Sequence, residues 1–158
     1  MNGKSALDEI DRKILNELAG DAEKPYSQIA KSLDVSNTMI HQRIARLKQL
    51  GVIEQTEIKL NEKALGYGSS AFTGIILKEV ANTAKVMEAL DKIPEVVECY
   101  FVSGAYNLFV KIIALNNDHL MHVLYDKIDS IKGIVRTETL INFRTVIKRG
   151  CPIPEDQP

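Results

Sequence analysis

Residues Tyr26 to Ile53 read YSQIAKSLDVSNTMIHQRIARLKQLGVI, and this stretch decides the fold expected of the N-terminal third of the chain. It predicts two short helices joined by a three-residue turn, Asp34 to Ser36. Apolar residues recur at helical spacing in each helix, at Ile29, Ala30 and Leu33 and then at Ile40, Ile44 and Leu47. Ser36 is expected to cap the second helix with its hydroxyl, and Gly51 is expected to end it in the left-handed conformation.

The second helix has a polar outer face that suits contact with DNA bases. At about 100° per residue, the side turned away from the apolar stripe carries Thr38, His41, Gln42, Ala45 and Gln49. Hydroxyl, amide and imidazole groups can read base edges, and a small residue in the middle allows close approach. A solvated helix that only keeps the domain soluble would have a similar face. The preceding helix, at the offset of a helix-turn-helix, favours DNA binding.

Basic residues flank this face, and no Asp or Glu occurs between Asn37 and Gly51. Cations on an acid-free helix suit contacts with phosphates, which supply most non-specific affinity for DNA. The residues predicted to contact double-stranded DNA are Ser36, Asn37, Thr38, His41, Gln42, Arg43, Arg46 and Lys48.

Composition limits the other classes of function. The chain has 158 residues and a formal net charge of −1, so any DNA-binding charge must be local. No apolar run is long enough to span a membrane and the N-terminus lacks the layout of a signal peptide, which predicts a cytoplasmic protein. Cys99 and Cys151 are the only cysteines. A buried thiol in a strand and a thiol in a loose tail fit a reducing compartment.

The pattern changes after residue 53, where a second domain is expected. Thr56, Ile58 and Leu60 alternate with polar residues and predict a short hinge strand, and Gly66 to Ser70 marks a linker. The following elements are predicted as strand 71–77, helix 83–93, strands 96–102 and 108–115, a helix capped by Asp118, and strand 135–147. In the first of these helices, Val86, Met87, Leu90 and Ile93 are expected to face inward, and in the second Leu120, Leu124, Ile128 and Ile131.

This order, β-α-β-β-α-β, is typical of a four-stranded antiparallel sheet with two helices on one face. The other face has no cover within the chain, although Ile, Phe and Val lie on both sides of the strands. We therefore expect the bare face to pack against a second copy of the chain. A homodimer would also supply two recognition helices for a two-fold related DNA site.

The whole pattern resembles the Lrp/AsnC, or feast/famine, family of transcription regulators. The residues that carry the resemblance are LDEIDRKILNELAGD at the start, SNTMIHQRIARLKQLGVI, VSGAYNLFVKI and TETLINF. It implies an α+β chain with an N-terminal (winged) helix-turn-helix domain and a C-terminal ferredoxin-like βαββαβ domain, called RAM, whose dimers assemble into octamers or larger rings. The expected boundaries are 1–54 for the helix-turn-helix, 55–70 for the hinge strand and linker, 71–150 for RAM and 151–158 for the tail.

The resemblance also implies a site for a small-molecule effector, of the amino acid class, between dimers. Its expected residues are Gly104, Ala105, Tyr106 and Asn107 in the turn between the two middle strands, with Thr137 and Thr139 of the last strand facing that turn. Family members that bind amino acids often have acidic residues beside and after the tyrosine, where this chain has Ala105 and Asn107. The effector is therefore a weaker amino acid ligand, another metabolite, or absent. A purely structural turn, with Gly104 at positive φ, is the alternative.

Motifs for catalysis and metal binding are missing. His119 and His122 have a spacing that can hold a metal, but no third ligand supports it, so we expect no metal and no cofactor apart from the effector. No phosphate loop and no nucleophile elbow occurs. The expectation is therefore a DNA-binding regulator and not an enzyme. The alternative is an enzyme on the same scaffold, because the sirohaem decarboxylases resemble this family.

Overall fold

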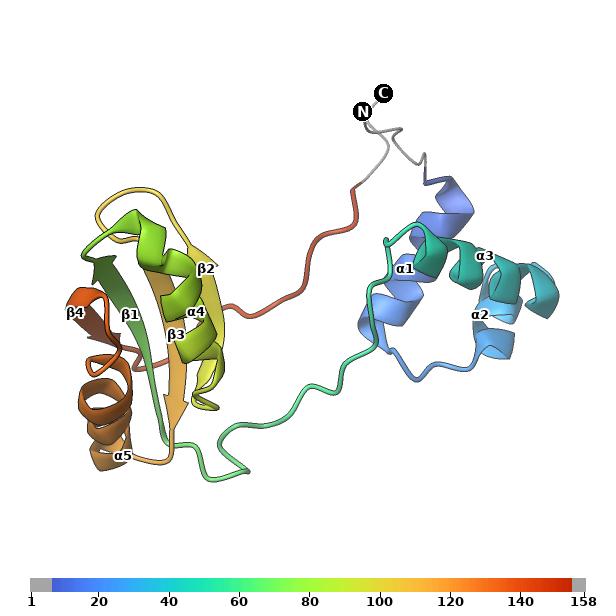
Figure 1. Ribbon diagram of the computed structural model, residues 1–158. Helices are drawn as coiled ribbons and strands as arrows, with labels where there is room; N and C mark the ends of the chain where they lie inside the picture. The colour runs from blue at the N-terminus through green and yellow to red at the C-terminus, as the bar shows by residue number, and fades with distance from the viewer. Residues whose placement is uncertain (1–6, 155–158) are drawn as a thin grey trace. The chain divides into compact units, whose positions relative to one another are not determined.

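The computed structural model describes residues 7–154 and divides the chain into two compact units (Figure 1). Within that range, one unit contains residues 7–59 together with residues 148–154, and the other contains residues 60–147. Residues 1–6 of the predicted helix-turn-helix domain and residues 155–158 of the predicted tail lie outside the described range. The compact units divide at residue 59, and residues 148–154 belong to the first of them. The predicted domain boundaries at residues 54, 70 and 150 stay a prediction.

Three helices form the first unit, namely α1 (Glu9–Gly20), α2 (Tyr26–Ser32) and α3 (Asn37–Gln49). The predicted apolar stripes of α2 and α3 meet α1 in one core. The buried residues of this core are Ile14, Ile29, Ala30, Ile40, Ile44 and Leu47. Burying about six such side chains is the main force that holds three short helices together, because isolated helices of this length are marginal in water.

The ends of α3 follow the prediction. Ser36 is the N-cap residue, and its Oγ accepts a hydrogen bond from the backbone N–H of Met39 at 3.1 Å. Gly51 has φ +69°, and the backbone N–H of Val52 bonds back to the carbonyl of Leu47 at 2.9 Å. Asp34, in the turn between α2 and α3, has φ +53°, a conformation that Asp tolerates better than most residues. These three positions fix the start and direction of α3.

The predicted hinge strand is absent. Residues 54–60 are extended but are not part of a sheet, and Ile58 is 83% exposed. A strand needs a second backbone to pair with, and no segment of the described chain pairs with this one. The alternating sequence is therefore not sufficient, in one chain, to form a strand.

The second unit is the predicted four-stranded antiparallel sheet. The strands are β1 (Ser69–Leu77), β2 (Val96–Phe101), β3 (Leu108–Ala114) and β4 (Ile134–Ile141), in the order β2-β3-β1-β4. After β1 comes the 3₁₀ turn η1 (Val80–Asn82), which leads into α4 (Thr83–Asp91); α5 (Asn117–His122) continues as the π-helical turn η2 (Val123–Ile128). Both helices lie on the same face of the sheet (Figure 1). The fold class expected from the sequence is confirmed.

Four local predictions for this unit were wrong. Asn116, and not Asp118, caps α5, because its side chain accepts the N–H of His119 at 2.8 Å. Met87 is exposed although it was placed inward, since Val86 and Leu90 already cover the sheet. Cys99 is exposed because β2 is an edge strand; both cysteines are free. β4 ends at Ile141, six residues early, because its last partner is Ala71 and only Ser69 and Ser70 of β1 lie beyond that pair.

The two faces of the sheet differ in burial. On the face under the helices, alternate residues are fully buried, and these are Ala71, Thr73, Ile75, Leu108, Val110 and Ile112. On the other face, no element of the second unit covers the side chains within the described residues, and Leu140 is 57% exposed. The two rings Phe72 and Phe109 stack there with centroids 6.0 Å apart. The predicted apolar, uncovered face is therefore present.

Candidate nucleic-acid interface and effector turn

The outer side of α3 is open to solvent along its whole length. Thr38, His41, Gln42, Ala45 and Gln49 are exposed, whereas the opposite side of the helix lies in the core. Among these residues His41 also has an aromatic neighbour, because its ring meets Tyr26 edge-on with centroids 5.0 Å apart. The face assigned to DNA thus has the exposure that base contacts need, and the adjacent α2 orients one of its side chains.

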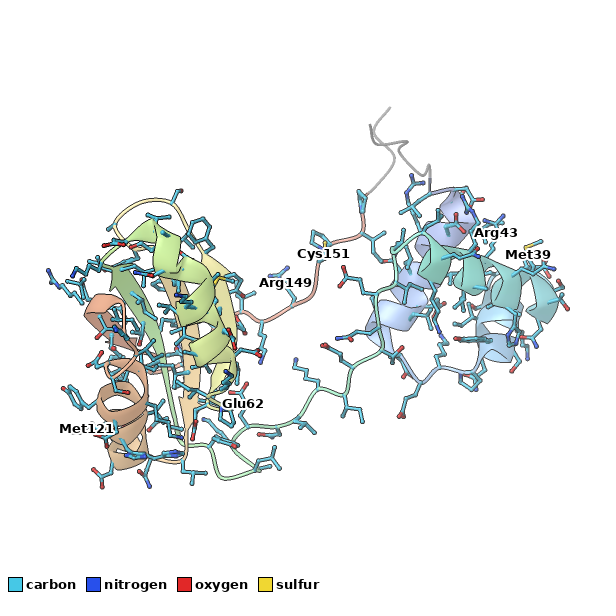
Figure 2. All side chains as sticks on the ribbon, in the orientation of Figure 1. Met39, Arg43, Glu62, Met121, Arg149 and Cys151 are labelled. Atoms are coloured by element: carbon cyan, nitrogen blue, oxygen red, sulfur yellow. The ribbon has the colours of Figure 1, made fainter. Side chains whose placement is uncertain are left out.

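Arg43, labelled in Figure 2, and Arg46 were predicted to contact phosphates. Both bond to a carboxylate within their own unit. Asp11 in α1 is fully buried and accepts a hydrogen bond from Arg43 at 2.9 Å and one from Arg46 at 2.8 Å. Arg43 also bonds to Asp8. In the sequence, Asp8 and Asp11 are simply acids near the start of α1, where the helix dipole favours them. Their main contacts, 32 to 35 residues away, had no local signal in the sequence.

Asp8 and Asp11 also form the start of α1. Asp8 is the N-cap residue and accepts the N–H of Asp11 at 2.8 Å, while the Asp11 carboxylate accepts the N–H of Asp8 at 3.3 Å. The hydrogen bond from Arg43 holds the pKa of Asp8 below its ordinary value, and the same bond, with that to Asp11, raises the pKa of Arg43. These bonds join the start of α1 to the middle of α3, so α1 helps to set the orientation of the recognition helix.

The basic side chains of α3 consequently differ in their exposure to solvent and in their ion pairs with carboxylates of the same unit. The side chain of Arg43 is 24% exposed and that of Arg46 is 47% exposed. Lys48 is exposed, and no ion pair within the described residues involves it. A phosphate that approaches α3 would therefore compete with Asp11 for both arginines. Lys48 can bind a phosphate without breaking an ion pair.

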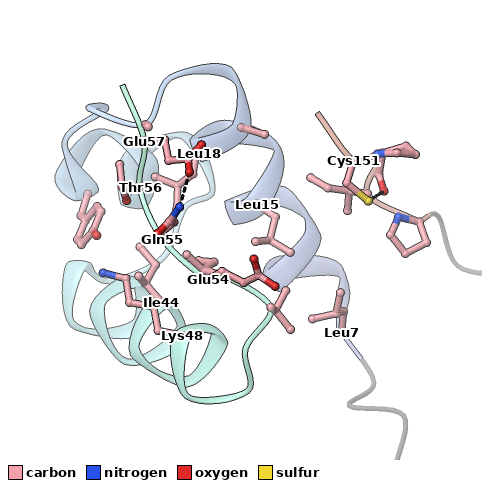
Figure 3. A pocket seen from close by; sticks show the side chains of 18 residues that line it. Leu7, Leu15, Leu18, Ile44, Lys48, Glu54, Gln55, Thr56, Glu57 and Cys151 are labelled. Atoms are coloured by element: carbon pink, nitrogen blue, oxygen red, sulfur yellow. Dashed lines mark hydrogen bonds between the residues drawn. The ribbon is translucent and has the colours of Figure 1, made fainter. Parts of the chain in front are cut away.

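A cavity of about 700 Å³ lies in the same unit (Figure 3). Its wall is mostly apolar and combines α1, the end of α3, residues 52–57 and tail residues 151–154. Ile44 reaches it from the core side of α3, and a side-chain hydrogen bond joins Gln55 to Glu57 at its rim. Sequence reasoning did not predict this cavity. Lys48 also lines it, whereas the outer face of α3, from Thr38 to Gln49, does not.

The turn between β2 and β3 is held by Asn107. Its side-chain oxygen accepts the backbone N–H of Leu77 at 2.9 Å, and its own N–H donates to the carbonyl of Ile75 at 2.9 Å. Gly104 has φ +114°, which a side chain rarely adopts, and Ala105 is exposed at the tip. The side-chain carbonyl of Asn107 thus already accepts a hydrogen bond at the end of β1.

Tyr106 lies on the uncovered face of the sheet. Its ring packs on Gly74, where an added Cβ would come within 2.6 Å of the ring. Its hydroxyl donates to Glu138 of β4 at 2.9 Å, and this bond raises the pKa of Tyr106. Glu138 was not predicted as a site residue. It supplies a carboxylate beside the turn, although the turn itself lacks the acids that are frequent in the family.

Thr137 and Thr139 do not face the turn, which corrects the expectation. They alternate with Glu138 along β4 and therefore lie on the helix-covered face, opposite to Tyr106. Thr137 donates to Asp129 at 2.8 Å, and Thr139 shares a hydrogen bond of 2.9 Å with the buried Thr73. The sequence shows that Thr137 and Thr139 lie on the same face of the strand. It does not show which face of the sheet that is, because this depends on how β4 pairs with β1.

His119 and His122 make separate contacts. His119 Nε2 lies 3.1 Å from Glu95, while its Nδ1 accepts the N–H of Leu115 at 3.2 Å, so the neutral ring carries its proton on Nε2. His122 lies 2.6 Å from Asp126. Within residues 7–154 no group of three or more acidic, His or Cys residues could hold a metal ion. Likewise, no helix in that range is long and apolar enough to cross a membrane.

Comparison with known proteins assigns both units to families. Residues 7–54 match winged helix-turn-helix DNA-binding domains, and residues 70–151 match the Lrp/AsnC ligand binding domain. The chain is 40% identical over 143 residues to the regulatory protein AsnC of Haemophilus influenzae. The matched region covers 90% of this chain and 95% of that protein.

Solved structures agree with this match. The structure of AsnC from Escherichia coli superposes with a TM-score of 0.87 at 39% identity and covers 91% of this chain and 97% of that one. A feast or famine regulatory protein from Mycobacterium tuberculosis, solved in complex with L-methionine, superposes with a TM-score of 0.86 at 28% identity, over 94% of this chain and all of that one.

Proposed function

Because the chain belongs to the Lrp/AsnC family of transcriptional regulators, we propose that its helix α3 reads an operator in double-stranded DNA and that a small metabolite controls how copies of the chain assemble on it. One observation supports this most directly. The outer side of α3 is exposed and contains no acidic residue, while the other side is buried in the core. The protein would act on chromosomal DNA in the cytoplasm.

The side chains of α3 divide into two roles. His41 and Gln42, exposed on the outer face, would contact base edges, with Thr38 and Asn37 near the start of the helix beside them. Lys48 and the exposed part of Arg46 would contact phosphates, with Arg43 held back by two carboxylates. Ser36 would contribute through the start of α3, since its hydroxyl is used by the cap.

Gel-shift titration of the full chain at several salt concentrations tests these roles. Lys48→Ala should weaken binding to all sequences and reduce the slope of log K against log salt by about 0.9, as for one lost phosphate contact. Gln42→Ala should instead reduce the preference for the operator over unrelated DNA. Lys92→Ala is the matched control, because Lys92 is an exposed cation at the C-cap of α4 that pairs with Glu88. An equal loss in all three variants would contradict the assignment.

The two-fold DNA site requires two copies, and the uncovered sheet face supplies a surface for them. Phe72, Phe109 and Leu140 lie there with Tyr100, and a monomer would leave these side chains in water. Burying them against the same face of a second copy gives a closed two-fold dimer, which can assemble further into an octamer. Light scattering on the purified protein tests this, and a mass of one chain would exclude it.

The effector would bind beside the turn Gly104–Asn107. The relative from M. tuberculosis was solved with L-methionine, which supports an amino acid as the class of ligand. In this chain the carboxylate for its ammonium would be Glu138, already positioned by Tyr106. Calorimetric titration with the common amino acids tests this, because Glu138→Gln should abolish binding that the wild type shows. Unchanged binding in that variant would place the ligand elsewhere.

The alternative function, a tetrapyrrole enzyme, receives no support from a specific contact in the site. The relatives that match about nine-tenths of the chain are named regulatory proteins. A Soret band on addition of a tetrapyrrole, together with loss of operator binding, would favour the enzyme.

A further inference from the structure

The DNA-binding unit has a single aromatic side chain and a single histidine, and the two are in contact. Among residues 7–59 and 148–154, Tyr26 is the only Phe, Tyr or Trp and His41 is the only histidine. Their rings meet edge-on, with centroids 5.0 Å apart and an angle of 72° between the ring planes. Aromatic pairs prefer this arrangement, because the positive edge of one ring then lies against the negative face of the other.

Tyr26 is fixed by the core of its unit. It is the first residue of α2, it is partly buried, and it packs against the cluster of buried residues that includes Ile29 and Ile44. Its side chain also forms part of the cavity wall, together with Ile44 and Lys48. A ring packed in this way has few orientations available to it. Tyr26 therefore presents a fixed surface to the middle of α3.

His41 has an open polar edge but a supported ring. Its side chain is exposed on the outer side of α3, and within the described residues neither ring nitrogen takes part in a hydrogen bond. An exposed side chain without a contact exchanges among rotamers, and binding then has to immobilise it at a cost in affinity. Because the ring of His41 already rests against Tyr26, part of this cost is removed before DNA arrives.

The neighbouring side chains of the outer face lack such a support. Thr38 and Gln42 are exposed on the same helix, and their side chains form no hydrogen bond within residues 7–154. Nor does either of them contact an aromatic ring that could hold it, since Tyr26 is the single ring of the unit besides His41. His41 therefore differs from them in having its direction set by a second helix.

We propose that Tyr26 is a positioning residue for DNA recognition, which holds the ring of His41 so that a ring nitrogen meets the base edge at one fixed position of the operator. The inference rests on the proposed function, in which α3 contacts bases, and adds how one of these contacts becomes specific. Each base pair presents its own pattern of donors and acceptors in the major groove. A ring of fixed direction can discriminate among these patterns, whereas a rotating ring finds a partner on several of them. A residue of α2 would thus influence sequence preference through α3.

The size of the expected effect follows from the aromatic pair. Edge-on pairs contribute a free energy that corresponds to roughly a 2- to 12-fold change in an equilibrium constant. Tyr26→Leu keeps an apolar side chain at the core but removes the ring, and it should lower the preference for operator over unrelated DNA by a factor in this range. Tyr26→Phe keeps the ring and loses only the hydroxyl, so it should retain the preference of the wild type.

Gel-shift titration of the full chain against a panel of operators, each with one base pair changed, tests the proposal. The operator is first selected from random DNA with the wild-type chain. Tyr26→Leu and His41→Ala should relax the preference at the same base pair, whereas Gln42→Ala, the matched control on the same face, should relax it at a different one. Adding Tyr26→Leu to His41→Ala should cause less than about a 2-fold further loss, because Tyr26 acts through the ring that is already absent.

Proton NMR of the same variants gives a readout that needs no DNA. The ring current of Tyr26 displaces the resonances of the His41 ring protons, which are assigned by their loss in His41→Ala. Tyr26→Leu should move these resonances towards the values of free histidine, and Tyr26→Phe should leave them displaced. Resonances that stay in place in Tyr26→Leu would show that the two rings are not in contact, and would overturn the proposal.

The titrations separate failure of this inference from failure of the proposed function. A wild-type chain without any sequence preference would overturn both. A clear wild-type preference that Tyr26→Leu leaves unchanged, or lowers equally at every base pair, would overturn the positioning role and leave DNA recognition by α3 intact. Equal losses in Tyr26→Leu and Tyr26→Phe would assign the effect to the hydroxyl and would also overturn the role of the ring.

Discussion

Replacing Asp11 by Asn tests whether this residue holds α1 to the recognition helix. The substitution keeps the volume of the side chain and removes the charge that two arginines share. Hydrogen bonds to charged groups contribute about 1.5–3 kcal/mol each, and two of them would give about 3–6 kcal/mol. Arg43 and Arg46 are partly exposed and regain water, so the lower limit applies. We expect a loss of about 3 kcal/mol, or roughly a 100-fold change in the opening equilibrium.

Hydrogen exchange measured by mass spectrometry resolves this loss helix by helix. Protection should fall in peptides of α1 and α3, while peptides of β1 and β3 serve as an internal standard and stay unchanged. Asp8→Asn is the matched control. It removes one contact to Arg43 from an exposed position, and Asn remains a good N-cap, so the loss should stay below about 1 kcal/mol. Equal losses in the two variants, or a loss below about 1 kcal/mol for Asp11→Asn, would refute the reasoning.

Three further predictions concern the sheet unit. Gly74→Ala should destabilise it by about 1–3 kcal/mol in urea unfolding and lower the pKa of Tyr106 in a spectroscopic titration, because the new methyl group displaces the ring from its bond to the carboxylate. Burial is the largest single effect and raises the pKa of Glu95, but the hydrogen bonds from Lys127, His119 and the backbone together outweigh it, so the pKa is lowered overall. Stability from this pair is therefore present above pH 4.5 and is lost as the pH falls below it, and Glu95→Gln should show a smaller acid-induced decrease in thermal unfolding temperature. Asn107→Ala should lower stability by about 1–3 kcal/mol, because it leaves an amide at the end of β1 without its acceptor; Asn107→Asp, which keeps the acceptor, should lose less.

Local signals in the sequence were sufficient for the helix-turn-helix. Ser36, Asp34 and Gly51 each act on the backbone within a few residues, so their conformations follow from residue type. The apolar spacing of α3 fixed which side is buried. The contact from Asp11 to Arg43 joins positions 32 residues apart, and nothing in either neighbourhood indicates it.

The sheet unit was predictable in order but less so in detail. Alternation located the strands, but only the pairing of β4 with β1 decides that Thr137 and Thr139 lie under the helices while Glu138 lies beside Tyr106. The end of β4 and the missing hinge strand have a common cause. Whether an extended segment becomes a strand depends on a neighbouring backbone, and a single sequence does not state which copy of the chain provides it.

The bare face of the sheet has a consequence for how this protein must be handled. If much of its apolar surface is removed from water only on association, folding and association cannot be separated, and the melting temperature will rise with protein concentration. Dilution would then lower the stability of the sheet unit, because it favours dissociation of the copies. Stabilities of variants are comparable only at one fixed concentration, and a related chain with a similar face could enter the assembly during co-expression.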